Sequence, residues 1–331
     1  MIDDAGPAST RVRIAIIDDY QGVATTVADW TPLSGRAELV SFADHLVDHD
    51  TLVGRLAGFD VIVVMRERTP FPRELLRRLP RLALLVTTGM RNKAIDLATA
   101  AELGITVSGT DLAASSTVEL AWALIMAVVR DLPGEDRRTR EGRWQQTVPL
   151  DLAGSTLGIL GLGRLGQRIA TLAQAFGMTV IAWSENLTAA AAAGHGAERV
   201  AKDELFRRSD IVSIHTLLSH RTRGLVGATE LALLGPAGYL VNTSRGPIVD
   251  EHALITALTQ GTIAGAALDV FDVEPLPPQH PLLSTPRTIL SPHIGFVSRQ
   301  SYRVAYGHAV QDVVGWLDGR PVRVLPAATR K

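Results

Sequence analysis

Short apolar runs alternate with amphipathic stretches along almost the whole chain, and this alternation limits the possible folds more than any other feature. The runs have the length of β-strands, and the stretches between them have the spacing of helices that bury one face. Strands that are joined through helices pair in parallel, with right-handed crossovers. The pattern therefore predicts an α/β fold.

The pattern occurs as two sets of elements. In the first set the expected strands are Val12–Ile17, Val61–Val64, Ala83–Val86 and Ile105–Ser108, and the expected helices include Arg73–Leu79 and Ala94–Leu103. A long helix over Ser116–Arg130 and a charged segment, Glu135–Arg143, separate the sets. The second set has strands at Thr156–Leu160, Thr179–Trp183, Ile211–Ile214, Tyr239–Asn242, Ala264–Leu268 and Thr288–Leu290. A helix over Ser301–Leu317 and a strand-like Val322–Leu325 follow.

The first strand of the second set opens into a helix through three glycines, Gly161, Gly163 and Gly166. Their spacing is G-x-G-x-x-G, in which the glycines allow a tight turn, approach of the backbone to a pyrophosphate, and close packing of helix on strand. The N–H groups at the start of the helix favour an anion. Because a strand precedes the glycines and a helix follows them, we expect a dinucleotide site that includes Arg164 and Leu165.

The next strand bears on which dinucleotide is bound. In such sites an acid about 20 residues further on holds the ribose hydroxyls. Here the strand is followed by Ser184 and Glu185, and either residue can occupy this position. No arginine or lysine follows immediately to bind a 2′-phosphate. We therefore expect NAD as the cofactor, with NADP as the alternative.

The length of 331 residues is enough for two domains, and 46% apolar residues allow each domain its own core. We expect two Rossmann-like, doubly wound parallel-sheet domains. Residues 114–296 are predicted to form the dinucleotide-binding domain. It is inserted into a substrate (catalytic) domain that consists of residues 1–113 and 297–331.

Three later strands of the second set are each followed by a residue with useful chemistry: Arg245, Glu274 and His293. In open parallel sheets the ligand crevice lies beyond the carboxyl ends of the strands. All three residues can therefore face one crevice.

The glycine loop and these three segments, in this order, resemble the D-isomer-specific 2-hydroxyacid dehydrogenases. That family includes glyoxylate/hydroxypyruvate reductases, phosphoglycerate dehydrogenases and D-lactate dehydrogenases. The resemblance covers most of the chain and is densest from Thr117 to Gly295. It implies an enzyme that transfers a hydride between NAD(P)H and a 2-keto acid or D-2-hydroxy acid, with the active site between the two domains. It also implies a homodimer, with the helix near Leu120–Val129 and the segment after it at the contact.

The resemblance assigns a role to each of the three residues. Arg245 matches the arginine that binds the substrate carboxylate and polarises its carbonyl, and a planar guanidinium suits a 2-keto acid. His293 matches the proton donor to the carbonyl oxygen in reduction and the acceptor in oxidation. Glu274 matches the acid beside that histidine, where a carboxylate favours the protonated imidazole. The resemblance thus implies that these are the catalytic residues, with Arg245 and His293 also binding the substrate.

Further cofactor positions follow from the resemblance alone. Asp269 matches the residue that hydrogen-bonds the nicotinamide carboxamide. Thr216 and Leu217 match positions that contact the cofactor, and Thr243 lies on the same side. His215 is expected to be structural.

One loop of the first set resembles the family's substrate loop, in which backbone N–H groups hold the substrate carboxylate. Thr88, Gly89 and Met90 are the candidate substrate-binding residues. Arg91 stands where the family often has an acid. It either favours a second anionic group on the substrate or is simply exposed.

Composition excludes several classes of function. Lysine and arginine number 33 against 34 acids, so the chain lacks the positive charge of a nucleic-acid binder. The absence of cysteine excludes disulfides and thiolate catalysis. His45 and His49 have no evident third ligand, and we predict no metal site.

The sequence also bears on location. The longest wholly apolar run, Leu120–Val129, is far shorter than the ~20 residues that span a bilayer, so it is expected to form a buried helix. The residues Asp3, Asp4, Gly6 and Pro7 do not resemble the start of a signal peptide. We expect a cytoplasmic protein that binds no membrane.

Related activities and one different class remain as alternatives. Formate dehydrogenases usually place glutamine beside the histidine, and Glu274 argues against them. Phosphite dehydrogenases keep an Arg–Glu–His set, and a biosynthetic phosphoglycerate dehydrogenase is a further alternative. Some relatives of the fold are cofactor-sensing corepressors, which should bind NADH and a peptide motif but turn over keto acids poorly.

Overall fold

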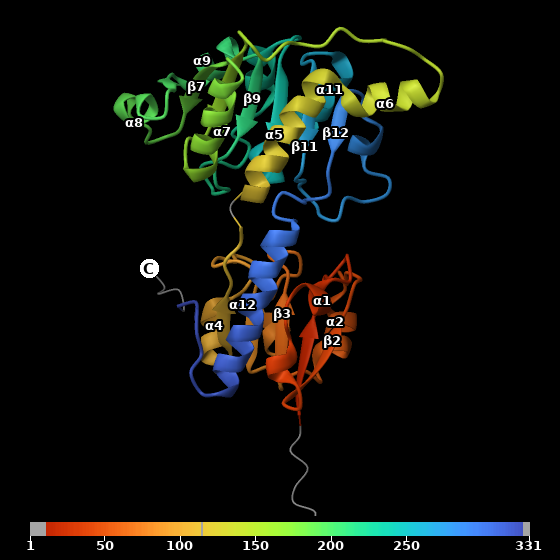
Figure 1. The fold of residues 1–331 in the computed structure, drawn as a ribbon, viewed down its shortest axis with the longest axis vertical. Helices are drawn as coiled ribbons and strands as arrows, with labels where there is room; N and C mark the ends of the chain where they lie inside the picture. Colours follow the sequence, from red (N-terminus) through yellow and green to blue (C-terminus); the bar gives the residue numbers. More distant parts are fainter. Residues whose placement is uncertain (1–10, 114, 327–331) are drawn as a thin grey trace, which may run out of the picture. The chain divides into compact units, whose positions relative to one another are not determined.

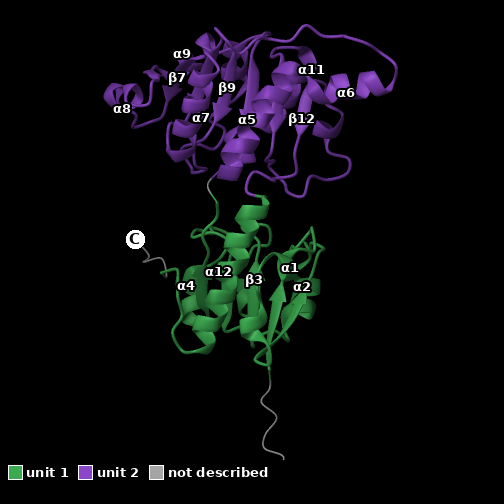
Figure 2. Ribbon diagram, viewed as in Figure 1, with its two compact units in different colours: residues 1–113, 297–331 green, residues 114–296 purple. Residues whose placement is uncertain are grey.

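A computed structural model describes residues 11–113 and 115–326. The chain divides into two compact units, one of residues 1–113 and 297–331 and the other of residues 114–296 (Figure 2). The expectation about a signal peptide was based on Asp3 to Pro7, which lie outside the described residues.

The first unit contains a five-stranded parallel sheet in the order β2-β1-β3-β4-β5 (Figure 1). Its strands are β1 (Val12–Ile16), β2 (Ala37–Ser41), β3 (Val61–Val64), β4 (Leu84–Thr87) and β5 (Thr106–Gly109). Every residue of the inner strands β3 and β4 is buried, which explains why both read as unbroken apolar runs. This strand order places a topological switch point between β1 and β3.

Five helices and a 3₁₀ turn accompany this sheet. They are α1 (Ala24–Val27), η1 (Thr31–Leu33), α2 (His49–Leu56), α3 (Arg73–Leu76), α4 (Leu97–Glu102) and α12 (Arg299–Leu317). Asp48, Asp96 and Ser298 cap α2, α4 and α12 by accepting hydrogen bonds from first-turn N–H groups. The 19-residue helix α12 packs against β4 and α1.

The segment after α12 is fastened to the edge strand β5. Arg323 contributes its carbonyl to Gly109 N–H at 3.0 Å, and its guanidinium lies 2.9 Å from the buried carboxylate of Asp312. We expected a strand at Val322–Leu325, whereas the structure has an isolated antiparallel bridge between Ser108 and Val324. A single bridge forms because the positive φ of Arg323, 50°, interrupts the extended backbone.

The second unit contains a seven-stranded parallel sheet in the order β12-β11-β10-β9-β6-β7-β8. Its strands are β6 (Thr156–Leu160), β7 (Thr179–Trp183), β8 (Glu198–Arg199), β9 (Ile211–Ile214), β10 (Tyr239–Asn242), β11 (Gly265–Leu268) and β12 (Thr288–Leu290). The prediction of an α/β fold with two parallel sheets is therefore confirmed. Because all seven strands run in one direction, their carboxyl ends share one edge of the sheet.

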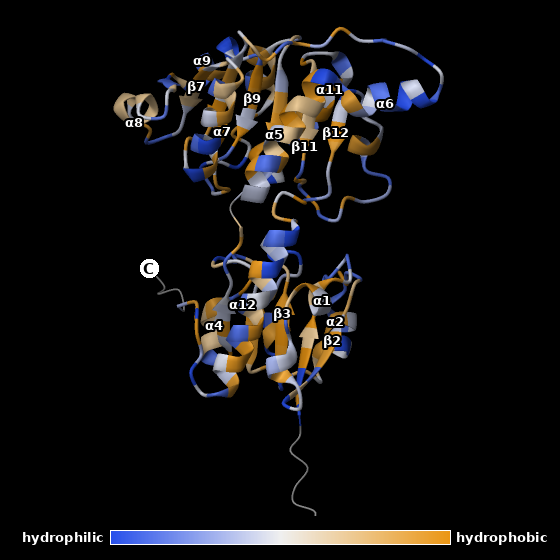
Figure 3. Ribbon diagram, viewed as in Figure 1, coloured by the Kyte–Doolittle hydropathy of each residue, from blue (hydrophilic) through white to orange (hydrophobic). Residues whose placement is uncertain are grey.

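Helices of this unit alternate with the strands. They are α5 (Ser115–Arg130), α6 (Leu132–Arg140), α7 (Arg164–Ala175), α8 (Ala189–Ala193), α9 (Lys202–Arg208), α10 (Ala228–Leu234) and α11 (Glu251–Gln260), with 3₁₀ turns η2 (Gly246–Ile248) and η3 (Pro281–Ser284). The strands carry most of the hydrophobic colour in Figure 3, whereas the exposed helix α6 is largely hydrophilic.

Helix α5 is the buried helix that the run Leu120–Val129 predicts. Its residues Leu124, Ile125, Val128 and Val129 belong to the core of the second unit. Within the described residues, no helix is long and apolar enough to cross a membrane.

Candidate active site

The glycine turn between β6 and α7 is built as its spacing predicts. Gly161 has a φ of 106°, and a Cβ there would lie 2.8 Å from the backbone of His215 and Thr216. A Cβ at Gly166 would lie 2.2 Å from the carbonyl oxygen of Gly161. A Cβ at Gly163, in contrast, would have no atom within 4 Å. Gly161 and Gly166 thus allow close packing of the chain, and Gly163 leaves open space where a ligand can approach.

The start of α7 offers donors to an anion. Its N-cap, Gly163, has no side chain that could accept the first-turn hydrogen bonds, and the following residues are Arg164, which is exposed, and Leu165, which is half-buried. A helix of 12 residues that begins without a side-chain cap presents its free N–H groups and its dipole to a negative group. A dinucleotide pyrophosphate fits this cradle.

The strand β7 ends beside the glycine turn. The two candidates for ribose binding that follow it, Ser184 and Glu185, have different surroundings. The hydroxyl of Ser184 accepts a hydrogen bond from Leu162 N–H at 3.1 Å, so this residue fastens the turn. Glu185, the next residue, is exposed. Of the two, Glu185 has the carboxylate suited to the ribose hydroxyls.

The end of β9 lies against the same turn. His215 N–H donates to the carbonyl of Leu160 at 2.8 Å, and Nε2 of its ring lies 2.8 Å from Ser213 Oγ. Burial lowers the pKa of His215 to about 4, so the ring is neutral near pH 7. The half-buried Thr216 and the exposed Leu217 follow it.

Thr243 and Asp269 stand at the ends of β10 and β11. Oγ1 of Thr243 is buried and has no hydrogen-bond partner within residues 11–113 and 115–326, which suits a ligand on this side. Asp269 is also buried, and its carboxylate accepts hydrogen bonds from Ser291 Oγ, Ile294 N and Gly295 N at 2.6–2.8 Å. Burial raises the pKa of Asp269, although these three hydrogen bonds act in the opposite direction. Asp269 therefore holds the 291–295 loop, a role that the sequence did not reveal.

Arg245 follows β10, the neighbour of β11 in the sheet. Its carbonyl accepts from the side-chain amide of Asn242 at 3.0 Å, and its Nη1 donates to the carbonyl of Ser244 at 2.7 Å. The next residue, Gly246, contacts the loop after β11 so closely that a Cβ would lie 2.1 Å from the carbonyl carbon of Phe271. The arginine segment and the loop that carries Glu274 are thus packed backbone to backbone.

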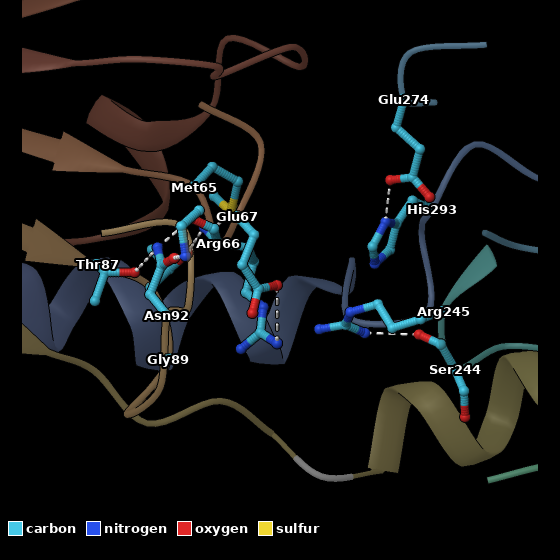
Figure 4. Close-up of polar contacts among 12 residues, drawn as sticks. Met65, Arg66, Glu67, Thr87, Gly89, Asn92, Ser244, Arg245, Glu274 and His293 are labelled. Carbon is cyan, nitrogen blue, oxygen red and sulfur yellow. Dashed lines mark hydrogen bonds and ion pairs between the residues drawn. The ribbon is translucent and has the colours of Figure 1, made fainter. Parts of the chain in front are cut away.

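Glu274 and His293 form a pair at the ends of the neighbouring strands β11 and β12. Oε2 of Glu274 lies 2.5 Å from Nδ1 of His293, and Oε1 accepts from Phe271 N–H at 2.9 Å. Figure 4 shows the imidazole pointing toward the side chain of Arg245. The backbone of His293 has a φ of 52°, which is uncommon for a residue other than glycine. The bonds from Asp269 to Ile294 and Gly295 hold this conformation.

The expected substrate loop follows β4 in the first unit. Thr88 N–H donates to the carbonyl of Val64 at 3.0 Å, and Gly89 N–H donates to Thr110 Oγ1 at 3.1 Å. These two N–H groups are already used, so the expectation that all three hold a carboxylate through the backbone needs correction. Met90, 42% exposed, has no such bond to a described residue, and it remains the available N–H of the three.

Arg66 follows β3 and contacts this loop, which was not anticipated from the sequence. Its N–H donates to Thr88 Oγ1 at 2.9 Å, and its guanidinium reaches Gly89, where a Cβ would lie 2.3 Å from Nη1. The side-chain amide of Asn92 donates to the carbonyl of Arg66 at 2.6 Å (Figure 4). The sequence did contain a signal for Arg66: a cation that closely follows a buried apolar strand lies at the carboxyl edge of the sheet, where ligands bind. Arg91, which we had considered for an anionic group, is exposed.

The two histidines that we considered as metal ligands lie in different surroundings. His45 lies 2.8 Å from the buried carboxylate of Asp18, and His49 begins α2. No group of three or more potential ligands gathers within residues 11–113 and 115–326.

Comparison with known proteins identifies similar sequences and structures. Residues 122–295 match the family model described as D-isomer specific 2-hydroxyacid dehydrogenase, NAD binding domain. The chain is 38% identical to a glyoxylate reductase of Aeropyrum pernix over 257 residues, which are 75% of this chain and 77% of the relative. It is 29% identical to a hydroxypyruvate reductase of Blautia hydrogenotrophica over 324 residues, 95% of this chain and 99% of the relative. A crystal structure of a phosphoglycerate oxidoreductase from Vibrio cholerae O395 is similar with a TM-score of 0.89, 36% identity, and coverage of 93% and 99% of the two chains.

Proposed function

Because the chain belongs to the D-isomer-specific 2-hydroxyacid dehydrogenases, we propose that it converts a 2-keto acid and NAD(P)H into a D-2-hydroxy acid and NAD(P)⁺, or catalyses the reverse reaction. Its class is that of an NAD(P)-dependent oxidoreductase that acts on a CH–OH group. The observation that carries the proposal is the pair of Glu274 and His293, whose facing atoms lie 2.5 Å apart. The two residues follow β11 and β12, and β11 lies between β12 and β10, the strand that leads to Arg245.

Arg245 is the residue that we propose for the substrate carboxylate. A guanidinium offers parallel donors to a carboxylate, and the positive charge also polarises the adjacent carbonyl. The hydrogen bonds of its backbone to Asn242 and of its side chain to Ser244 orient the arginine before a substrate arrives.

His293 moves the proton in this proposal. Its Nδ1 faces Glu274, so Nε2 is the atom that donates to the carbonyl oxygen during reduction and accepts the proton during oxidation. The carboxylate of Glu274 stabilises the protonated ring, and Phe271 N–H fixes that carboxylate through its other oxygen.

NAD(P)H supplies the hydride when it is bound. The turn with Gly161, Gly163 and Gly166 would hold its pyrophosphate, together with the N–H groups of Arg164 and Leu165. We place the ribose hydroxyls at Glu185, which favours NAD. We assign the nicotinamide side to Thr216, Leu217, Thr243 and Asp269. The carboxylate of Asp269 accepts three hydrogen bonds and keeps a lone pair for the carboxamide of the nicotinamide.

In the first unit we propose that Met90 N–H contributes to binding of the substrate. Thr88 and Gly89 shape the loop. The guanidinium of Arg66 lies at Gly89 and 3.9 Å from the carboxylate of Glu67, and we propose that it attracts the anionic substrate.

A homodimer is also proposed. The apolar face of α5 is buried in its own unit, and the segment after the helix is the part of the expected contact that exposes apolar side chains. There Leu132, Trp144 and Val148 are 55%, 73% and 100% exposed. Exposed apolar side chains that recur along one segment are typical of a protein contact. Light scattering after gel filtration should give twice the chain mass, and a monomer would contradict the proposal.

The reaction is tested by following the absorbance of NADH and of NADPH with glyoxylate, hydroxypyruvate, pyruvate and phenylpyruvate. Rapid oxidation with one of them is expected. His293→Ala should lower kcat by about 10²- to 10⁴-fold, the usual contribution of a general acid, whereas the exposed His195→Ala should have no effect. Tight binding of NADH without turnover of any keto acid would contradict the proposal and favour a phosphite dehydrogenase or a cofactor-sensing corepressor.

A further inference from the structure

The loop that carries Glu274 runs from Phe271, three residues after β11, to His280, the N-cap of η3. Residues 272–275 and 277–279 are exposed, and Leu276 is the residue of its middle that packs against the core of the unit. Apolar burial therefore fixes little of this loop. The position of the Glu274 carboxylate must depend on polar contacts.

Glu251 makes such contacts with both ends of the loop. It is the first residue of α11, whose start is fixed by the Asp250 cap. Oε1 of Glu251 lies 3.0 Å from Nε2 of His280, and Oε2 accepts a long hydrogen bond of 3.5 Å from Asp272 N–H. Burial first, and then the charge of Glu251, raise the pKa of Asp272, in agreement with the closeness of the two carboxyl groups. The carboxylate of Glu251 thus joins the two ends of a loop that apolar packing holds only at Leu276 in its middle.

The contact between Glu251 and His280 has a defined direction. Leu282 N–H donates to Nδ1 of His280 at 3.3 Å, so the ring proton is on Nε2, which donates to Glu251. The side chains of His280 and Glu251 are only 15% and 21% exposed, which reduces competition from water.

The same contact ties the loop to the segment of Arg245. Glu251 follows Arg245 by six residues on one continuous segment. Gly246, between them, allows the segment to pack directly on the backbone of Phe271 and Asp272. A displacement of the loop would therefore change the position of Glu274 relative to both His293 and Arg245.

We propose that Glu251 and His280 are positioning residues of the active site, which hold the loop of residues 271–280 so that Glu274 stays on His293. This inference rests on the proposed function. Neither residue is required to touch the substrate or the cofactor.

The test combines a spectroscopic and a kinetic measurement on the full-length protein. A hydrogen bond of 2.5 Å between a carboxylate and Nδ1–H should give a strongly low-field proton signal of His293, which Glu274→Gln identifies by removing it. Glu251→Ala and His280→Ala should also remove it. They should lower kcat by about ten- to hundredfold, as a small displacement of a catalytic group does, with the Kd of NADH unchanged.

Two further variants separate positioning from stability. His280→Gln keeps an N–H donor toward Glu251 and should restore the signal and most of kcat. His252→Ala, an exposed neighbour on α11, should behave as the wild type. If Glu251→Ala does not fold, Glu251→Met keeps a similar side-chain volume without either acceptor oxygen and is expected to show the same losses.

The inference is overturned if Glu251→Ala keeps both the low-field signal and kcat while its melting temperature falls, because Glu251 would then only stabilise the fold. A wild-type protein that turns over no 2-keto acid would refute the proposed function instead. The proton signal can be measured without turnover, so the two failures are distinguishable.

Discussion

Oε2 of Glu274 lies 2.5 Å from Nδ1 of His293, although the two residues are 19 positions apart in the sequence and follow different strands. Phe271 N–H holds the other oxygen of this carboxylate. The contact sets which ring nitrogen faces Glu274, so Nε2 is left for a substrate. The expected acid–base role of His293 depends on this geometry.

Replacing the carboxylate by an amide tests the pair. Glu274→Gln keeps the size of the side chain but removes the charge that stabilises the protonated ring. Keto-acid reduction should fall by about ten- to hundredfold. Steady-state kcat measures this, and a kcat equal to that of the wild type would refute the role of Glu274.

Gly246 is predicted to be intolerant of a side chain. In Gly246→Ala the new Cβ would meet the backbone of Phe271 at 2.1 Å and push the Arg245 segment away from the Glu274 loop. We expect kcat to fall and the free energy of unfolding to decrease by about 1–3 kcal/mol, the usual cost of overpacking.

A matched glycine provides the control. A Cβ at Gly307, inside α12, would have no atom within 4 Å. Gly307→Ala should leave kcat unchanged and raise the free energy of unfolding by about 0.5–1 kcal/mol in urea denaturation. Equal effects of the two substitutions would contradict the packing described for Gly246.

Glu185 is predicted to select the cofactor. Without its carboxylate the ribose hydroxyls lose a charged acceptor, and a 2′-phosphate no longer meets a negative charge. Glu185→Ala should raise the KM of NADH about tenfold and leave that of NADPH unchanged or lower. Asp203→Ala, an exposed acid on α9, serves as control. An unaltered ratio of the two KM values would exclude Glu185 from the ribose site.

Asp312 should make the stability of the protein depend on pH. Burial raises the pKa of Asp312 to about 7, although Arg323 acts in the opposite direction. A carboxyl group whose pKa is higher in the folded state stabilises that state at low pH, and this contribution is lost as pH rises from about 4 through about 7. Asp312→Asn should therefore show a smaller decrease in unfolding free energy between about pH 5 and about pH 8 than the wild type. Identical decreases in urea denaturation would refute this.

The sequence predicted the strands of the second sheet well because each is a short apolar run between helical segments. The strands β6, β7, β9, β10 and β12 have the predicted bounds. The strands β2 and β8 were missed because they lie at sheet edges, where exposed residues such as Glu38 and Glu198 break the apolar pattern.

Contacts between distant segments could not be predicted. The backbone donors of Thr88 and Gly89 looked available from the loop sequence, but Val64 and Thr110 accept them only once the sheet has formed. The contact of Arg66 with Gly89 and that of Glu251 with His280 likewise depend on tertiary packing. The resemblance could assign roles to Arg245, Glu274 and His293, but not the groups that hold them.

The most direct test of the central claim uses NADH that carries deuterium at the transferable position. The wild-type protein should produce a D-2-hydroxy acid with deuterium on the carbon that was the carbonyl, as seen by chiral chromatography and mass spectrometry, and both Arg245→Ala and His293→Ala should lose most of this product. An L-2-hydroxy acid, a product without deuterium, or as much product from both variants as from the wild type would contradict the account.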